Sequence, residues 1–290
     1  MGKRVEKVML SFESKDNYIN LFDNITDLSQ YLSSKKRKEG RDKSSEDSDS
    51  GFSGTKSFQE AFDLFRYGDE ELYKKFKEQS SKINIDKLLG NAVRKQKYVN
   101  RNYGCVPNVP NYLIGNPLNM INAEIGRISH KVINIFLSIG VPWTVDKEDI
   151  INTGIIYLSV IDLLEKAGYR CNLYAGVTAS SAKHEYMYVR IKTDREPLNL
   201  KKLVFPLVHP SMLRRIYFRW AEVNDYDYDI TGGYGKNDDE KTILNNMKKI
   251  YNEDFILWTY NNIGKNKDHN IKKIEEILED LKKKGIELNI

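Results

Sequence analysis

The residues of this sequence with the clearest chemical potential lie in one basic and aromatic segment, HPSMLRRIYFRW, from His209 to Trp220. Arginine can hold a phosphate or a carboxylate through two parallel hydrogen bonds and can stack on aromatic rings. Pro210 and Ser211 suit the start of a helix, whose free backbone N–H groups favour anions. The segment therefore predicts an anion-binding or partner-binding site. Its candidate residues are His209, Arg214, Arg215 and Arg219.

Helical spacing leaves two roles open for these arginines. Arg215 and Arg219 share one face of a helix, and Arg214 lies about one hundred degrees away from them. In one interpretation they contact a partner or a nucleic-acid backbone. In the other they form ion pairs that hold this helix to the acidic loop NDYDYDITGGYGKNDDE, which follows it directly.

Sequence signatures of nucleotide and metal chemistry are missing. The chain has no G-x-G-x-x-G or G-x-x-x-x-G-K-[ST] motif, and its four histidines do not have the H-E-x-x-H spacing of a zinc site. Asp225, Asp227 and Asp229 begin like a calcium loop, but Ile230 stands where glycine is needed and Lys236 where glutamate is needed. We therefore expect no cofactor, no metal and no enzymatic activity.

The nucleophile candidates also have simpler interpretations. Cys171 lies in an apolar run and is expected to be a small buried side chain, whereas Cys105 has no basic residue nearby to activate it. The polar segment Ser180–His184 lacks the strand–turn–helix context of a nucleophile elbow. A hydrolase or nuclease remains as an alternative if Asp146, Asp149 and the acidic loop converge in space.

The second half of the chain, which must position the arginines, has an α/β pattern. Residues 131–138 (KVINIFLS) form a continuous apolar run, typical of a strand buried on both faces. Asp146 then caps a helix that ends at Gly168, and the strand YRCNLYAGV follows, with EYMYVRIKT as an edge strand. Because strands alternate with helices, we predict a doubly wound, mostly parallel sheet. The remaining elements are a helix over 241–251, strand DFILWTY, helix NIKKIEEILEDLKKKG and strand IELNI.

The first 129 residues predict helices around a charged linker. Apolar residues at helical spacing indicate a helix over 17–33, and further helices are expected after Thr55 or Ser57, after Asp69 and over 85–97. The segment KKRKEGRDKSSEDSDSG is strongly charged and is expected to be disordered. The predicted organisation is an N-terminal helix (1–34), a disordered charged linker (35–51), a helical region with a Pro/Asn-rich connector (52–129) and an α/β domain (130–290).

The order of elements in residues 131–290 resembles a von Willebrand factor A-like domain. The resemblance lies in the first strand, the long helix ending in LEKAGY, the second strand, and the late DFILWT strand, helix and KKGIE strand. Many members of that family bind a metal ion through Asp-x-Ser-x-Ser after the first strand. Here the turn reads Leu137-Ser138-Ile139-Gly140-Val141, so the carboxylate is missing and the resemblance implies a degenerate metal site.

Three further segments resemble an uncharacterised protein family encoded by bacteriophages and mobile elements. They are GTKSFQEAFDLFRYGDEE, VPNVPNYLIGNPLNM and FPLVHPSMLRRIYFRW. This resemblance implies a phage or prophage context and brings no established activity.

Composition bounds the function. Lys and Arg number 46 against 41 Asp and Glu, and the resulting net charge of +5 is mild for 290 residues. No stretch is apolar enough for a signal peptide or a membrane span, so we expect a protein of the host cytoplasm, with virion association left open. The leading interpretation is a non-enzymatic protein that binds another protein, as scaffold, inhibitor or complex component. The alternative is contact with nucleic-acid phosphates through the Lys/Arg linker and the arginine helix, and the oligomeric state stays open.

Overall fold

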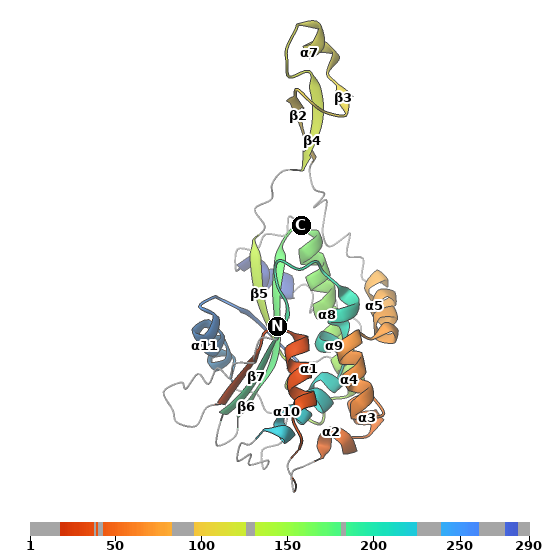
Figure 1. The fold of residues 1–290 in the computed structure, drawn as a ribbon, viewed down its shortest axis with the longest axis vertical. Coiled ribbons are helices and arrows are strands. Elements are labelled where there is room, and N and C mark those ends of the chain that lie inside the picture. The colour runs from red at the N-terminus through yellow and green to blue at the C-terminus, as the bar shows by residue number, and fades with distance from the viewer. Residues whose placement is uncertain are drawn as a thin grey trace.

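A five-stranded sheet forms the centre of the structure (Figure 1). The computed structural model describes residues 18–37, 39, 43–82, 96–125, 131–180, 184–224, 239–260 and 276–283. The strands of the sheet are β1 (Tyr18–Phe22), β5 (Val132–Ser138), β6 (Arg170–Ser180), β7 (His184–Lys192) and β8 (Ile256–Thr259). Their order is β1-β7-β6-β5-β8, and β6 and β7 form the one antiparallel pair among the four. The predicted α/β class with a mostly parallel sheet is therefore confirmed.

Strand β5, which lies between β6 and β8, is buried on both faces, as its apolar run predicts. Ile133, Ile135 and Leu137 pack into the larger hydrophobic core, whereas Phe136 packs into a smaller one. Because successive side chains of a strand point to opposite faces, the two cores lie on opposite sides of the sheet. Helix α11 (Glu240–Tyr251) contributes two buried side chains to the smaller core, and Figure 1 shows it across the sheet from the other helices of the body.

Helix α8 (Lys147–Lys166) connects β5 to β6 and is buried along most of its length, as expected for a helix that is apolar on nearly every side. It packs against α9 (Leu200–Val208). Gly154 makes this close approach possible, since a Cβ atom there would lie 2.6 Å from the Leu207 carbonyl oxygen and 2.6 Å from the Val208 Cα.

The N-terminal segment corrects the expectation of one helix over residues 17–33. Tyr18–Phe22 form strand β1, which pairs in parallel with β7, and the helix α1 (Ile25–Ser34) begins only after Asn24. The apolar residues at 19, 21 and 22 fit a strand as well as a helix, and pairing with β7 decides between them. The same pairing corrects the expected edge position of EYMYVRIKT, because β7 lies between β1 and β6.

The charged linker is also not disordered where the structure describes it. Residues 44–47 form helix α2 (Ser44–Asp47) and residues 50–53 form helix α3 (Ser50–Ser53), with Ser45 and Ser53 buried. The composition of this segment does not explain why it is ordered. Its contacts with Arg214, Arg215 and Glu222, described below, do.

The next two helices agree with the sequence pattern. Helix α4 (Phe58–Tyr67) is capped by Ser57, whose hydroxyl accepts from the Glu60 N–H, and it ends at Gly68. Asp69 caps helix α5 (Glu70–Lys82). Their apolar faces join the same core as β5 and α8, so the predicted boundary between residues 129 and 130 does not separate two hydrophobic cores.

Residues 96–125 form a small antiparallel sheet of their own, which we call the apolar module. Its elements are β2 (Gln96–Arg101), β3 (Val106–Pro107), α7 (Val109–Leu113) and β4 (Met120–Ile125), in strand order β2-β4-β3. Figure 1 shows it apart from the five-stranded sheet. The sequence predicted an irregular connector over residues 102–120. Instead, Pro107 lies in β3 and Pro110 lies in the first turn of α7.

Some predicted elements fall outside the described residues. These are most of the helix over 85–97, most of the acidic loop and the last strand, IELNI. Within the predicted late helix, residues 276–283 are helical. Among the described helices, none has the length and the apolar character needed to cross a membrane.

Candidate functional site

Arg214 is buried and points into the protein. Its Nη1 donates to the Phe52 carbonyl oxygen at 2.7 Å, and its Nη2 donates to the Val145 carbonyl oxygen at 2.5 Å. The guanidinium lies 3.9 Å from the centre of the Phe52 ring. Burial lowers the pKa of Arg214 to about 10, and nearby Asp146 opposes that effect. Arg214 therefore ties α3 and the turn before α8 to the core.

Arg215 uses all three of its nitrogen atoms in the same way. Nε donates to Thr55 Oγ1, Nη1 donates to the carbonyl oxygens of Ser45 and Glu46, and Nη2 donates to those of Ser48 and Thr55. The side chain is fully buried, and burial lowers its pKa. One guanidinium thus fixes the backbone of residues 45–55, which explains why the charged linker is ordered there.

The predicted anion-binding helix start is closed by internal contacts. His209 ends α9, stacks on Phe205 with ring centres 4.8 Å apart, and accepts a hydrogen bond from the Ser211 N–H through Nδ1. Burial, with a smaller effect from Lys147, lowers the pKa of His209 to about 3. The Ser211 hydroxyl donates to the Ser53 carbonyl oxygen.

These contacts correct the interpretation of His209, Arg214 and Arg215 as partner-binding residues. All three are buried, with hydrogen bonds to the chain itself, so a ligand cannot reach them. Arg214 and Arg215 do hold their helix in place, as the second interpretation expected. Their partners, however, are backbone carbonyl oxygens of residues 45–55 and Val145. The acidic loop proposed as their partner lies mostly outside the described residues. Residues 212–217 form a π-helix, η1 (Met212–Tyr217), followed by α10 (Phe218–Val223), so spacing based on a regular α-helix misplaced these side chains.

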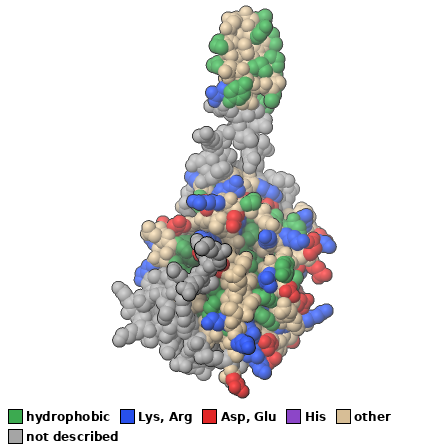
Figure 2. All heavy atoms as spheres, in the orientation of Figure 1, with side chains coloured by type: hydrophobic (Ala, Val, Ile, Leu, Met, Phe, Trp, Pro, Cys, Tyr) green, Lys and Arg blue, Asp and Glu red, His purple; other side chains and the backbone are tan. Residues whose placement is uncertain are grey.

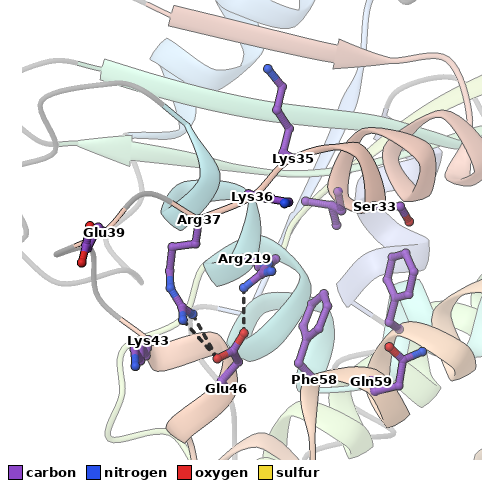
Figure 3. A pocket seen from close by; sticks show the side chains of 12 residues that line it. Ser33, Lys35, Lys36, Arg37, Glu39, Lys43, Glu46, Phe58, Gln59 and Arg219 are labelled. Carbon is purple, nitrogen blue, oxygen red and sulfur yellow. Dashed lines mark hydrogen bonds and ion pairs between the residues drawn. The ribbon is translucent and has the colours of Figure 1, made fainter.

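Arg219 lines the pocket described next. Its Nη1 lies 2.9 Å from Glu46 Oε1, and Arg37 Nη1 lies 3.1 Å from Glu46 Oε2. Figure 3 shows both guanidinium groups directed at this carboxylate. Burial alone would raise the pKa of Glu46, but the hydrogen bonds and charges of Arg37 and Arg219 outweigh it and hold that pKa below its ordinary value. Glu46 is therefore a carboxylate bridging two arginines.

The pocket around this bridge has a volume of about 750 Å³, within the range of ligand sites. Phe58 and Phe62 form part of its apolar wall, and the Arg219 guanidinium lies 5.2 Å from the centre of the Phe58 ring. Among the described residues, five cationic side chains line it against two carboxylates, Glu39 and Glu46. The cationic lining residues are Lys35, Lys36, Arg37, Lys43 and Arg219.

Sequence reasoning considered these cations separately, as a charged linker and an arginine helix. Residues 35–43 and Arg219 are far apart in the sequence, and only the fold brings them together. Sequence reasoning missed Glu46 as a site residue. The local signal that was available is a carboxylate at the start of the acidic half of the linker, but nothing local pairs it with Arg219.

The structure also locates the other chemical candidates. Cys171 is buried, as predicted, and burial together with Glu165 raises the pKa of its thiol to about 12, against an opposing effect of Lys192. Cys105 is exposed. Ser138, in the turn compared with a metal site, is fully buried. Asp225, Asp227 and Asp229 lie outside the described residues, and no group of three His, Cys, Asp or Glu side chains that could hold a metal occurs within the described part.

The apolar module carries the most concentrated exposed apolar surface among the described residues (Figure 2). Its 30 residues include three charged side chains, Lys97, Arg101 and Glu124. None of its residues 98–122, the part whose burial the structure describes, belongs to the hydrophobic cores of the body. Its large exposed side chains are Tyr98, Tyr103, Val106, Val109, Tyr112, Leu113, Ile114 and Leu118.

Comparison with known proteins assigns a family without an activity. A family model described as a domain of unknown function (DUF7192) matches residues 3–285, so the chain belongs to that family. No curated protein and no solved structure matches the chain.

Proposed function

We propose that this is a non-enzymatic protein that binds another protein through the apolar module. The observation that carries the proposal is the set of eight large apolar side chains exposed between Tyr98 and Leu118. Monomeric proteins seldom expose contiguous apolar patches of more than a few hundred Å², and larger ones mark interaction sites. Leu113 and Ile114 are 76% and 77% exposed, so they are the side chains that gain most from burial against a partner.

The composition of the module supports a protein partner over a charged one. Tyrosine with Leu and Ile is typical of the centre of a protein interface, where charged residues are depleted. Three charged residues among 30 compare with 30% charged residues in the whole chain. The partner surface that fits is apolar, with hydrogen-bond acceptors for tyrosine hydroxyls.

Copurification from native cells followed by mass spectrometry tests this function. The expected result is one protein retained by the wild type and lost from a Leu113→Asp/Ile114→Asp double variant. Trp143→Asp is the matched control, because Trp143 is 81% exposed and lies outside the module. Retention of the same protein by the double variant, or no specific protein with the wild type, contradicts the proposal.

The finer fold assignment is also a proposal. We infer a von Willebrand factor A-like arrangement for residues 131–290, supported by the order β7-β6-β5-β8, which corresponds to strands 3-2-1-4 of a doubly wound sheet. An experimental structure that includes residues 261–290 tests it, and strands beyond β8 in that order are expected.

A phage or mobile-element context, with the protein in the host cytoplasm, remains a proposal that rests on the three sequence segments described above. Mass spectrometry of infected cells and of purified virions tests it. Detection in the lysate but not in virions is expected for a cytoplasmic protein, and detection in virions would make it a structural component.

One specific observation favours a second function, contact with nucleic-acid phosphates. Four linker cations, Lys35, Lys36, Arg37 and Lys43, line one pocket together with Arg219, although the sequence offered the linker and the arginine helix as two separate basic features. Since phosphate contacts release counterions, binding of an oligonucleotide should weaken steeply between about 50 mM and about 200 mM salt. A mobility-shift titration at low salt without a complex would remove this function.

A further inference from the structure

We propose that the pocket contains a phosphate-binding subsite between Arg37 and Arg219, and that the Glu46 carboxylate occupies this subsite until a phosphorylated ligand displaces it. The proposal rests on the second function only for the source of the phosphate, because a free phosphorylated molecule has the same charge and oxygen geometry as a nucleic-acid phosphate. It is independent of the apolar module.

One of the two arginines has a hydrogen-bond donor to spare. Arg219 Nε is a buried nitrogen atom that has no hydrogen-bond partner among the described residues. Arg37 Nη1 is ion-paired, lying 3.1 Å from Glu46 Oε2 and 3.7 Å from Glu222 Oε2. Buried polar atoms in native structures nearly always have a partner, so the unused Arg219 donor at this pocket points to a ligand. A phosphate offers more acceptor oxygen atoms than the Glu46 carboxylate and suits the planar fork of arginine.

The Glu46 side chain can move into solvent. It is 43% exposed, whereas the side chains of Arg37 and Arg219 are each 16% exposed, so the carboxylate is the outer member of this bridge. A phosphate also carries more negative charge than the carboxylate, in a pocket whose cations exceed its carboxylates by five to two.

The backbone beneath Glu46 stays in place when the side chain moves. Arg215 holds the carbonyl oxygens of Ser45 and Glu46, and the Glu222 carboxylate holds the Ser45 N–H and hydroxyl. Glu46 can therefore change its side-chain rotamer while α2 remains docked. The subsite opens without unfolding the segment that carries it.

The first experiment measures binding of a labelled single-stranded oligothymidylate by fluorescence anisotropy, with inorganic pyrophosphate as competitor. The second measures binding of pyrophosphate itself by calorimetry. Arg219→Gln is expected to weaken binding of whichever probe binds by about tenfold, the effect of one charge-assisted hydrogen bond. Glu46→Gln is expected to tighten it by about threefold, since the competing carboxylate is removed. If Glu46 instead contributed a contact to the ligand, Glu46→Gln would weaken binding, so the expected tightening distinguishes the two roles.

Two controls separate the subsite from general charge effects. Lys202→Gln and Glu71→Gln change the net charge by the same amounts at exposed residues that do not line the pocket. If Glu71→Gln tightens binding as much as Glu46→Gln, or if Glu46→Gln leaves binding unchanged or weaker, the proposal is overturned. Urea unfolding verifies that each variant folds, and Lys36→Gln, at the exposed rim, replaces Arg219→Gln if that variant does not fold.

The two probes distinguish the sources of the phosphate. Binding of both, with competition, supports a nucleic-acid phosphate in the subsite. Binding of pyrophosphate alone supports a free phosphorylated ligand and removes the nucleic-acid function while the subsite stands. If neither probe binds, the subsite is overturned, whatever the outcome of the copurification experiment.

Discussion

The Glu222 carboxylate accepts two hydrogen bonds from Ser45, a residue 177 positions earlier in the chain: one from the backbone N–H at 2.7 Å and one from the hydroxyl at 2.5 Å. Both residues are buried. Together with Arg215, this contact docks α2 and α3 on the helix that carries Arg219. The pocket wall therefore depends on a segment whose own composition favours disorder.

Removing the Glu222 side chain should destabilise the fold. Glu222→Ala leaves the Ser45 N–H and hydroxyl buried without partners, and we expect the free energy of unfolding to fall by about 3 kcal/mol. Glu222→Gln keeps the shape and one acceptor, so a loss of about 1 kcal/mol is expected. Urea unfolding measures both, and equal losses would contradict the role assigned to the two hydrogen bonds.

Arg215 should be irreplaceable by lysine. A lysine ammonium keeps the charge but cannot reproduce the fork that binds Thr55, Ser45 and Ser48, so Arg215→Lys should cost about 3 kcal/mol or more. The segment around residues 44–53 should then become accessible to proteases. Limited proteolysis with a glutamate-specific enzyme should release a new cut at Glu46. Arg219→Lys is the control, since it lies at the pocket, and should leave the segment protected.

His209 should make the protein sensitive to acid. Because burial lowers its pKa to about 3, folding favours the neutral imidazole. The unfolded chain takes up a proton near the ordinary pKa of 6.5, so this contribution to stability is complete above that pH and is lost as pH falls toward 3.

His209→Gln separates this effect from carboxylate titration. Glutamine does not titrate and can still accept from the Ser211 N–H. Between about pH 7 and about pH 4, wild type should lose about 3 kcal/mol more than the variant in urea unfolding. Parallel losses in the two proteins would mean that His209 does not stay neutral in the fold.

The sheet and its main helix could be predicted because their signals are local. The apolar run of β5 and the apolar helix after Asp146 need no information from distant residues, although the Asp146 side chain makes no capping hydrogen bond. β1 could not be placed in this way, because its residues fit two periodicities and its partner β7 lies far along the chain. The acidic loop and the last strand stay predictions.

The candidate site was harder to predict for a physical reason. The partners of Arg214 and Arg215 are backbone carbonyl oxygens, and every residue type has one, so no side-chain pattern announces them. Ser45 lies 170 positions from Arg215. The sequence therefore identified the arginines as unusual. It assigned their hydrogen bonds to a ligand, whereas Arg214 and Arg215 donate them to the chain itself. Arg219 differs because its side chain lines the pocket, where it pairs with Glu46.

At the crossing of α8 and α9, replacing Gly154 by alanine should destabilise the protein, although alanine favours a helix more than glycine does. Gly154→Ala should stabilise an isolated helix by about 1 kcal/mol. Here the added Cβ would lie 2.6 Å from backbone atoms of Leu207 and Val208, so the helices must separate, and we expect a net loss of about 2 kcal/mol. Asn152→Ala on the same helix is the control and should stay within about 0.5 kcal/mol of wild type. A stabilised Gly154→Ala protein would contradict the close approach.

Excision of the apolar module should leave the body intact. No residue of 98–122, the part of the module whose burial is described, belongs to either hydrophobic core, so the described cores of the sheet and its helices do not depend on it. Replacing residues 96–125 by a short Gly/Ser linker also shortens the loop, whose closure entropy changes only slowly with length. The free energy of unfolding of the body should therefore change by less than about 1 kcal/mol. The excised protein should unfold in one transition and lose the copurifying partner, yet still bind the phosphate probe that the wild type binds. A large drop in stability would mean that the module folds onto the body, in which case its apolar side chains serve the protein itself and not a partner.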